Sequence, residues 1–440
     1  MSNNVFIFYI LLIPKPYEKY SAGGCYEEPD YEQKVGNWVE ISNNFKNGSQ
    51  LTLNGLYKSG KKVGKWDILY NYKGKNEKIF NNINPIEYRG GGSYEIGGDE
   101  LKEGNWVEVL DNFKDNSQLT QNGVYKNGKK VGRWDIWFNY KGNNEQMQYF
   151  IIGGGYYEEN EQKEGSWVEI SNIFTDISQI IYSGKYINGK KIGIWEICHR
   201  KQDVNLYLII LICQFYGNYS GGGSYDEKGN ELKVGDWVDI SDDWKDFCQI
   251  TYKGEYKNGR KFGSWDIEEI IDFKKPLKIM QTKESNQYRA GGQYDKVGYG
   301  VKLGKWIELH HEFLTQATFH GEYRNGRKVN KWDIYLKQNG KNEYIGGGLY
   351  DDQESENLGP VKQGKWIELD DRFQEYQDQM LFIRDCRATH QGEYSNNKKF
   401  GRWDSYFSNY QIGGGLYNEN GVKEGFWSQL SESFSMLDIC

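Results

Sequence analysis

Three sets of side chains in this 440-residue chain have the types and spacing for chemistry. An acidic residue stands two positions after each of six tryptophans, and such a row of carboxylates could bind cations or a basic ligand. The six acids are Glu40, Glu108, Glu169, Asp239, Glu308 and Glu368. A single cluster combines His310 and His311 with Glu308 and Glu312. Glu308, His310 and Glu312 would share one face of a strand, which makes a metal site conceivable.

The third set consists of basic residues in short turns, and read alone it predicts a comb that binds phosphate or lipid headgroups. Its members are Lys126, Lys129, Lys130, Lys190, Lys191, Lys257, Arg260, Lys261, Arg324, Arg327, Lys328, Lys398 and Lys399. Neighbouring turns are acidic, with Glu27, Glu28, Glu158, Glu159, Asp226, Glu227, Asp351 and Asp352. Turns two strand spacings apart lie about 10 Å from one another, near the Debye length, so we expect partial neutralisation.

Each set also has a purely structural interpretation, which we favour. One carboxylate for every four strands is too sparse for multidentate coordination, so the acids are expected to pair with lysines on neighbouring strands. The five histidines are His199, His310, His311, His320 and His390, and they recur at no common position. Gly64-Lys65-Trp66 and Gly304-Lys305-Trp306 lack the remaining residues of a phosphate-binding loop. The sequence therefore predicts no catalytic, cofactor-binding or metal-binding residues and no enzymatic activity.

The elements that position these residues are repeats. Gly-x-Tyr, a polar insert and Gly-x-Trp recur thirteen times, in two alternating half-units that we call A and B. A opens with a glycine cluster, and seven positions after its tryptophan stands Phe45, Phe113, Phe174, Trp244, Phe313, Phe373 or Phe434. In B, seven steps separate tyrosine from glycine, and Asn330 is the only residue that replaces that glycine. The chain divides into a variable segment 1–21, repeats 22–89, 90–152, 153–220, 221–289, 290–345 and 346–412, and a half repeat 413–440.

Half-unit B has the pattern of a β-hairpin. Asn-Gly pairs such as Asn258-Gly259 lie between alternating runs and favour a type I′ turn. Counting back from that turn pairs Gly254 with Gly263, Tyr252 with Trp265 and Ile250 with Ile267. The same count pairs Phe319 with Trp332 and Tyr182 with Trp195. Paired glycines beside a tryptophan would leave room for its indole to lie over them, so we expect each tryptophan to cover a glycine. In A the step from tyrosine to glycine is always even, which keeps both on their faces as inserts lengthen the hairpin.

The residues from Tyr252 to Gly263 resemble a MORN repeat, whose pattern is Tyr-x-Gly-x-aromatic-x-x-Gly-x-x-x-Gly. Leu53, Gln121 and His390 replace the first tyrosine in other copies, and a tryptophan follows as in the variant of antitoxin-like MORN proteins. With the A half-units as degenerate copies, the resemblance spans nearly the whole chain. It implies an elongated sheet of hairpins used for scaffolding, protein contacts and proposed lipid contacts.

The predicted fold is all-β, an elongated antiparallel meander of hairpin repeats with about four strands per repeat. The alternative is a kelch-like β-propeller, because double glycines, Tyr and Trp in four-stranded units also occur there. The duplication of the pattern within each repeat argues against propeller blades.

Composition excludes several classes of function and protein. Fifteen Trp, 35 Tyr and 20 Phe argue against a disordered chain, and aromatic side chains must supply most of the core. A net charge of -7 disfavours nucleic acid and anionic membranes. The cysteines, at 25, 198, 213, 248, 386 and 440, follow no repeat position and are predicted to be reduced. Apolar runs at 5–13 and 206–213 are too short to span a membrane, and we expect strands there, with a signal peptide as the alternative for the first.

Together these observations predict a cytoplasmic, non-enzymatic scaffold that binds another protein, with no cofactor and no nucleic acid. The alternative function is phospholipid association through the basic turns. Because the edges of a long sheet can pair with other strands, homo-oligomers are also possible.

Overall fold

The computed structural model describes residues 23–27, 33–42, 51–72, 75–78, 90–97, 99–111, 113, 118–141, 147–175, 178–200, 219–242, 250–272, 275–278, 290–310, 317–338, 341–352, 359–370, 388–407 and 410–428. The apolar runs at 5–13 and 206–213 and the cluster members His311 and Glu312 lie outside these ranges. The chain forms two compact units, Met1–Leu232 and Lys233–Cys440.

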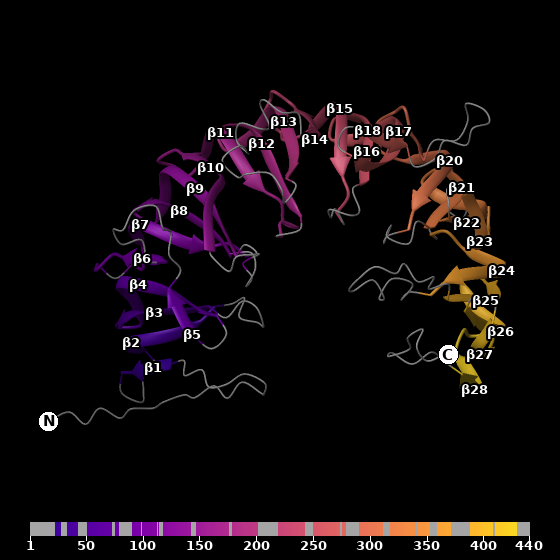
Figure 1. Cartoon of the computed structure of the whole chain (residues 1–440), viewed down its shortest axis with the longest axis horizontal. Helices are drawn as coiled ribbons and strands as arrows, with labels where there is room; N and C mark the ends of the chain where they lie inside the picture. The colour runs from indigo at the N-terminus through magenta and orange to yellow at the C-terminus, as the bar shows by residue number, and fades with distance from the viewer. Residues whose placement is uncertain are drawn as a thin grey trace. The chain divides into compact units, whose positions relative to one another are not determined.

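The first unit is an antiparallel sheet in which strands pair in chain order (Figure 1). Its strands are β1 (Gly23–Tyr26), β2 (Lys34–Ile41), β3 (Leu51–Lys58), β4 (Lys61–Tyr72), β5 (Lys75–Lys78), β6 (Gly91–Tyr94), β7 (Lys102–Val109), β8 (Gln118–Lys126), β9 (Lys129–Lys141), β10 (Met147–Tyr157), β11 (Lys163–Ile170), β12 (Gln179–Ile187), β13 (Lys190–Arg200) and β14 (Tyr219–Tyr225). The short β5 pairs with the far end of β4, and β6 pairs with its near end.

The second unit repeats this meander. Its strands are β15 (Lys233–Ile240), β16 (Ile250–Lys257), β17 (Arg260–Asp272), β18 (Lys275–Lys278), β19 (Gly291–Tyr294), β20 (Lys302–Leu309), β21 (Ala317–Arg324), β22 (Arg327–Gln338), β23 (Lys341–Tyr350), β24 (Lys362–Leu369), β25 (Ala388–Ser395), β26 (Lys398–Phe407), β27 (Tyr410–Tyr417) and β28 (Lys423–Ser428). A short strand, β18, again pairs with the end of its long neighbour β17.

These pairings confirm the all-β meander and exclude the kelch-like alternative. Propeller blades are separate four-stranded sheets. Here the backbone ladder runs on from one repeat into the next, as in β4 to β6 and β17 to β19. Within the ranges that the structure describes, no helix has the length and apolar character to cross a membrane.

All six B turns have the predicted type I′ conformation. Both central residues have positive φ, for example 49° at Asn258 and 76° at Gly259. Ser59-Gly60 and Asn396-Asn397 adopt the same angles, because serine and asparagine tolerate the left-handed region at modest cost.

The predicted register holds only near the turn. Glu255 pairs with Phe262 as counted, but beyond a bulge Tyr252 pairs with Ile267 and Ile250 with Glu269. The predicted partners Trp265 and Ile267 are therefore wrong for these residues. The same shift makes Ile334 the partner of Phe319 and Ile197 the partner of Tyr182, where Trp332 and Trp195 had been predicted. The count fails because it assumes one residue opposite one residue, and each bulge places two additional residues on the second strand.

The bulge gives the two glycines of a hairpin different roles. Gly132 has a φ of 70°, and no atom lies near the position that a side chain would take. It is therefore needed for the left-handed backbone of the bulge and not to make room for an indole. Gly123 lies directly beneath the indole of Trp134, where a methyl group would overlap the ring. Among the residues that the structure describes, twelve glycines lie beneath an indole in this way, which confirms that the tryptophans cover glycines. Asn330 keeps φ at 59° where other copies have glycine, which explains why that substitution is tolerated.

The core has two parts along each strand. Tryptophans and tyrosines form one part, in which rings contact one another edge to face. Mixed clusters of aliphatic and aromatic side chains form the other, such as the one that includes Leu119, Ile152 and Phe174. Phe113 and Phe174, two of the aromatics seven positions after an A tryptophan, are buried in these clusters. The sequence predicts a mainly aromatic core, and this prediction describes only the first of these two parts.

The prediction of reduced cysteines is wrong for Cys198, which is buried at the end of β13 and disulfide-bonded. Cys25 is a free thiol.

The different roles of the two glycines give a direct test by substitution. We expect Gly123→Ala to lower the free energy of unfolding by about 2 to 3 kcal/mol, because the new methyl group must displace the indole of Trp134. Gly132→Asn should cost less than about 1 kcal/mol, since asparagine accepts the left-handed backbone. Urea unfolding monitored by tryptophan fluorescence measures both. Equal losses in the two variants would contradict this division of roles.

Candidate functional site

The repeated polar residues of each unit form a network on the tryptophan face of the sheet. It is built from the motif Lys-x-Gly-x-Trp. A lysine stands four residues before the tryptophan in all thirteen copies, and the glycine is replaced in one copy, by Asn330. Each of these lysines places its Nζ over the indole of its own tryptophan, at 4.0 to 4.7 Å from the ring centroid. Such contacts stabilise a cation by about 0.5 to 2 kcal/mol, the higher value applying when water is excluded.

The bulge explains why lysine and tryptophan meet. In a regular strand, residues four apart are separated by about 13 Å, too far for close ring contact. The extra residues of the bulge shorten that path, so that Lys130 reaches over Trp134 at 4.3 Å. The left-handed Gly132 between them makes the bulge possible.

The tryptophans themselves form a continuous column with the tyrosines of Gly-x-Tyr in each unit. From Trp106 through Tyr125 to Trp134, successive centroids are 5.8 and 5.2 Å apart with nearly perpendicular planes. This edge-to-face order places the positive edge of one ring against the negative face of the next. Most indole N–H groups donate to a backbone carbonyl; Trp134, for example, donates to Val124 at 3.3 Å.

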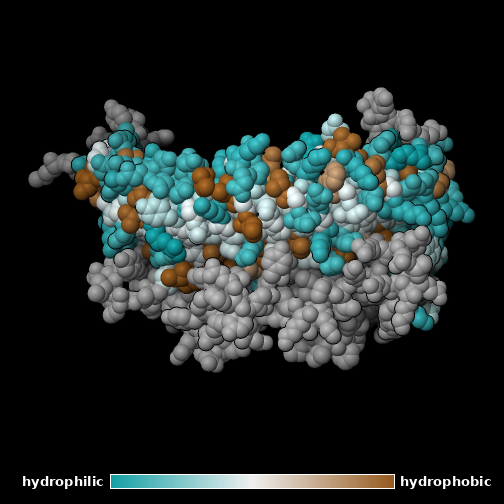
Figure 2. Space-filling view, turned by 90° about the horizontal axis from the view of Figure 1, so that it is seen from above, coloured by the Kyte–Doolittle hydropathy of each residue, from teal (hydrophilic) through white to brown (hydrophobic). Residues whose placement is uncertain are grey.

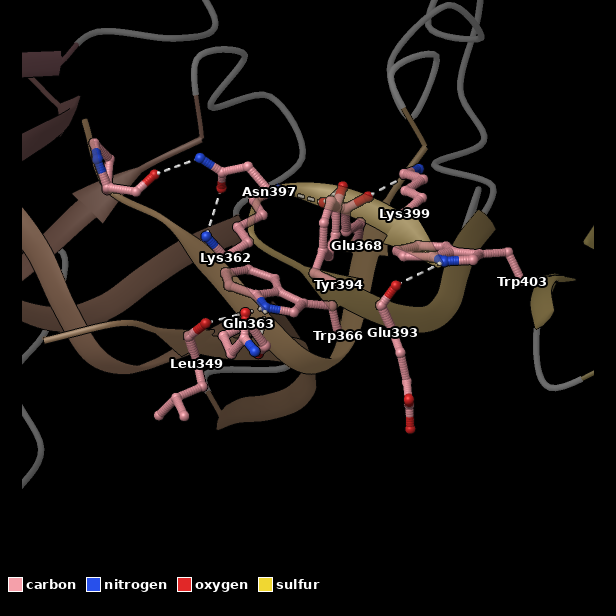
Figure 3. A network of polar contacts seen from close by, with 11 residues as sticks. Leu349, Lys362, Gln363, Trp366, Glu368, Glu393, Tyr394, Asn397, Lys399 and Trp403 are labelled. Carbon is pink, nitrogen blue, oxygen red and sulfur yellow. Dashed lines mark hydrogen bonds and ion pairs between the residues drawn. The ribbon is translucent and has the colours of Figure 1, made fainter. Parts of the chain in front are cut away.

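In five of the six copies, the acid after the A tryptophan lies between two of these lysines. Glu40 contacts Lys34 at 2.6 Å and Lys62 at 2.7 Å, and it accepts a hydrogen bond from the Tyr57 hydroxyl at 2.7 Å. Glu108, Glu169, Glu308 and Glu368 repeat this arrangement. Figure 3 shows Glu368 beside Lys399 and Tyr394, with Lys362 close to Trp366. The predicted pairing of these acids with lysines is confirmed, but the lysines do not lie on adjacent strands: Lys34 is on the same strand as Glu40, and Lys62 is on β4, with β3 between them.

The network shifts the pKa values of its members. Burial alone would raise the pKa of Glu169, but the charges and hydrogen bonds of Lys163 and Lys191 outweigh burial and lower it to about 2. Glu40 has a pKa of about 2 for the same reasons. Burial, together with neighbouring carboxylates, raises the pKa of Tyr94 and Tyr157 to about 12. The carboxylates are thus charged and the phenols neutral throughout the ordinary pH range.

The same network removes part of the predicted basic comb. Lys130, Lys191, Lys328 and Lys399 lie over indoles and against carboxylates. Of the lysines at the turn tips, Lys126 pairs with Glu159 and Lys190 with Glu231, both at 3.3 Å, and Lys61 approaches Asp99 at 3.8 Å. The predicted alternation of charge along one edge is confirmed within the described part of the first unit.

The histidine cluster does not assemble as a metal site in the described residues. Glu308 belongs to the lysine network, and His310 is buried in a stack on Phe319. No group of three potential metal ligands occurs among the residues whose placement is described. Burial lowers the pKa of His320 to about 4, so this side chain is neutral where it contacts Thr318 and Tyr335.

A different histidine forms the polar cluster that the sequence analysis missed. The His390 ring contacts Ser405 Oγ and Asp370 Oδ2, both at 2.8 Å. In neighbouring repeats the place of Ser405 is taken by Ile267 or Ile334, both buried core residues. The sequence does carry a sign of this cluster, because His390 and Ser405 are both polar at repeat positions that are apolar in neighbouring repeats.

A cavity of about 320 Å³ opens beside Glu40 and is lined by residues of β2 and β3 together with Val109, Asp111 and Phe113. The Glu40–Lys62 pair on its wall already has its charges matched. The remaining lining mixes apolar side chains such as Leu51 and Leu53 with the polar residues Ser42 and Asp111.

The carboxylate network makes a pH prediction. Since the pKa of Glu169 is lowered from 4.5 to about 2 on folding, its stabilising effect is complete above about pH 4.5 and is lost as the pH falls toward 2. Glu169→Gln should lower the free energy of unfolding at pH 7 by about 2 kcal/mol, less than the loss for a fully buried pair. The variant should also lose less stability than the wild type between pH 4.5 and 2.5.

Urea unfolding at several pH values measures both effects. Glu158→Gln, in an exposed turn of the same hairpin, is the matched control and should follow the wild type. Identical pH profiles for the wild type and Glu169→Gln would show that the carboxylate does not stabilise the fold.

Comparison with known proteins leaves the function to be argued from these residues. No protein-family model matches the chain, and the search of curated proteins finds no match.

Proposed function

We propose that the chain is a non-enzymatic, MORN-like repeat scaffold that binds another protein through the face of the sheet opposite the Trp–Tyr column. The MORN-like assignment is supported by the shared build of the two half-units. Both carry a glycine beneath an indole, a left-handed residue at the bulge and the Lys-x-Gly-x-Trp sequence.

One observation carries the binding proposal: the repeated residues are engaged within the sheet, whereas the variable outward positions hold exposed apolar side chains. Tyr156 lies between Gly155 and Tyr157, which face the column, so alternation turns it outward, and it is 50 % exposed. Ile194 is 71 % exposed beside Trp195. The outward face of the first unit also carries Leu56 and Val124, and the corresponding face of the second unit carries Leu349, Phe400, Leu416 and Phe426.

The distribution of these residues suits a protein partner. Figure 2 shows hydrophobic residues as separate spots within a mainly hydrophilic surface. Protein interfaces combine apolar anchors with polar surroundings in this way. Phospholipid association through the basic turns is less well supported, because the lysines of the network are already paired with carboxylates.

An interface on this face predicts a selective effect of substitution. The double variant Tyr156→Glu, Ile194→Glu should weaken binding of the partner by at least about tenfold, the effect of losing about 1.4 kcal/mol of contact energy. The partner is first identified by affinity purification with the wild-type chain from its native cells. Binding of that purified partner to each variant is then measured by calorimetry.

The matched control is Asn160→Glu, Gln162→Glu, which adds two negative charges in the exposed turn between β10 and β11, away from the outward face. It should bind within about threefold of the wild type, since substitutions outside the centre of an interface cost little. Equal weakening in both double variants, or none in either, would contradict the assignment of this face.

A second candidate function, hydrolysis at a single non-repeated site, is favoured only by the Ser405–His390–Asp370 cluster. A histidine between a serine and an aspartate is the arrangement that activates a nucleophilic hydroxyl. A fluorophosphonate probe reacts with such serines. Under the scaffold proposal, Ser405 is labelled no faster in the wild type than in His390→Gln. Rapid labelling of Ser405 that requires His390 would replace the scaffold by an enzyme.

A further inference from the structure

One repeat departs from the lysine network by a single methylene group. In the network, two lysines and one tyrosine surround one acid. This acid is a glutamate in five copies, but after Trp237 it is Asp239. Asp239 still contacts Lys233 at 2.6 Å and accepts a hydrogen bond from the Tyr256 hydroxyl at 2.7 Å. Both of its oxygens are therefore occupied on the side of β15 and β16.

The second lysine of this set, Lys261, has no ion pair among the residues that the structure describes. In the glutamate copies, the second carboxylate oxygen lies 2.7 to 3.1 Å from the corresponding lysine. Those lysines are Lys62, Lys130, Lys191, Lys328 and Lys399. An aspartate reaches about 1.5 Å less far, the length of one carbon–carbon bond, and this shortfall leaves Lys261 without a carboxylate.

Lys261 remains held against aromatic rings. Its Nζ lies 4.1 Å from the Trp265 centroid and 5.3 Å from that of Tyr252, and the side chain is half-buried. Like its five counterparts, Lys261 is partly shielded from water. Unlike them, it has no ion pair within the described part of the chain that offsets the cost of this desolvation. The titratable groups around it are Asp239 and Lys233 on β15, Tyr252 and Tyr256 on β16, Tyr294 on β19 and Lys302 on β20.

These surroundings favour the neutral amine. Burial lowers the pKa of Lys261; Asp239 opposes this from a distance, and the positive charges of Lys233 and Lys302 lower the pKa further. A desolvated lysine near other cations is the usual form of a nucleophilic lysine.

We propose that Lys261 is the preferred site of Nε-acylation among the six equivalent lysines of the network, reactive toward activated acyl esters and thioesters. The lone pair of its neutral amine attacks the acyl carbon. A C–N bond forms, the bond from carbon to the leaving oxygen or sulfur breaks with its electron pair, and the excess proton on nitrogen passes to solvent. The product is a neutral amide.

The product is also better accommodated here than at the five equivalent lysines. Acylation of Lys130, for example, would remove one of the two ammonium groups that hold Glu108. At Lys261 no ion pair is broken, and the neutral amide relieves a half-buried charge.

The test compares Lys261 with its five counterparts in one full-length chain. The folded protein is treated briefly with limiting N-hydroxysuccinimidyl acetate at neutral pH, then unfolded and fully acetylated with deuterated reagent, and mass spectrometry reads the isotope ratio at each lysine. We expect Lys261 to react at least about threefold faster than the mean of the five, because desolvation raises the fraction of reactive neutral amine. A rate at or below that mean would overturn the proposal.

Two reciprocal variants test the cause. Asp239→Glu supplies the missing methylene and should bring Lys261 into the range of the other five, while Glu308→Asp should raise the rate at Lys328. Circular dichroism establishes that each variant is folded; if Asp239→Glu is not, Glu308→Asp alone decides. An unchanged Lys261 in folded Asp239→Glu, or an unchanged Lys328 in Glu308→Asp, would overturn the proposed cause. Acylation is read at individual lysines, so this result is independent of any binding partner.

Discussion

The lysine held between an indole face and a carboxylate is the interaction on which the rest of each sheet depends. Each complete set brings two ammonium groups to one carboxylate, as Lys102 and Lys130 approach Glu108. One carboxylate cannot neutralise two cations, and the remaining positive charge lies against the negative faces of tryptophan and tyrosine rings. The aromatic column therefore provides both the packing and part of the charge compensation.

The glycines and bulges follow from this requirement. An ammonium group can reach the indole only if the strand is shortened, and a left-handed residue such as Gly132 shortens it. The indole in turn can lie flat on the sheet only where the neighbouring strand has no side chain, as at Gly123. The two glycines of a hairpin thus serve two different physical constraints, although they look alike in the sequence.

The sequence predicted the features that depend on local conformation. Type I′ turns follow from Asn-Gly, and the covering of glycines by tryptophans follows from their common periodicity. The register beyond the bulge could not be counted, because the sequence does not distinguish a glycine with left-handed backbone from a glycine in a regular strand.

The lysine motif could have been found, since Lys-x-Gly-x-Trp is visible in the sequence. It was overlooked because turn lysines such as Lys130 were assigned to a solvated edge, and only the bulge folds them onto the rings. The cluster around His390 was missed because counting from the Asn396-Asn397 turn pairs His390 with Trp403, and only the bulge brings Ser405 opposite His390.

Repetition within one chain provides its own reference for the exceptions. Asn330 replaces glycine but keeps the left-handed backbone, so the bulge and the Lys328–Glu308 pair survive, and the change is conformationally neutral. Asp239 keeps the charge and the backbone but shortens the reach, and the consequence falls on Lys261, on a different strand. A conservative exchange of one acid for the other is therefore the larger chemical change of the two. What matters at these positions is whether a carboxylate oxygen reaches the second ammonium group, and residue class alone does not determine that distance.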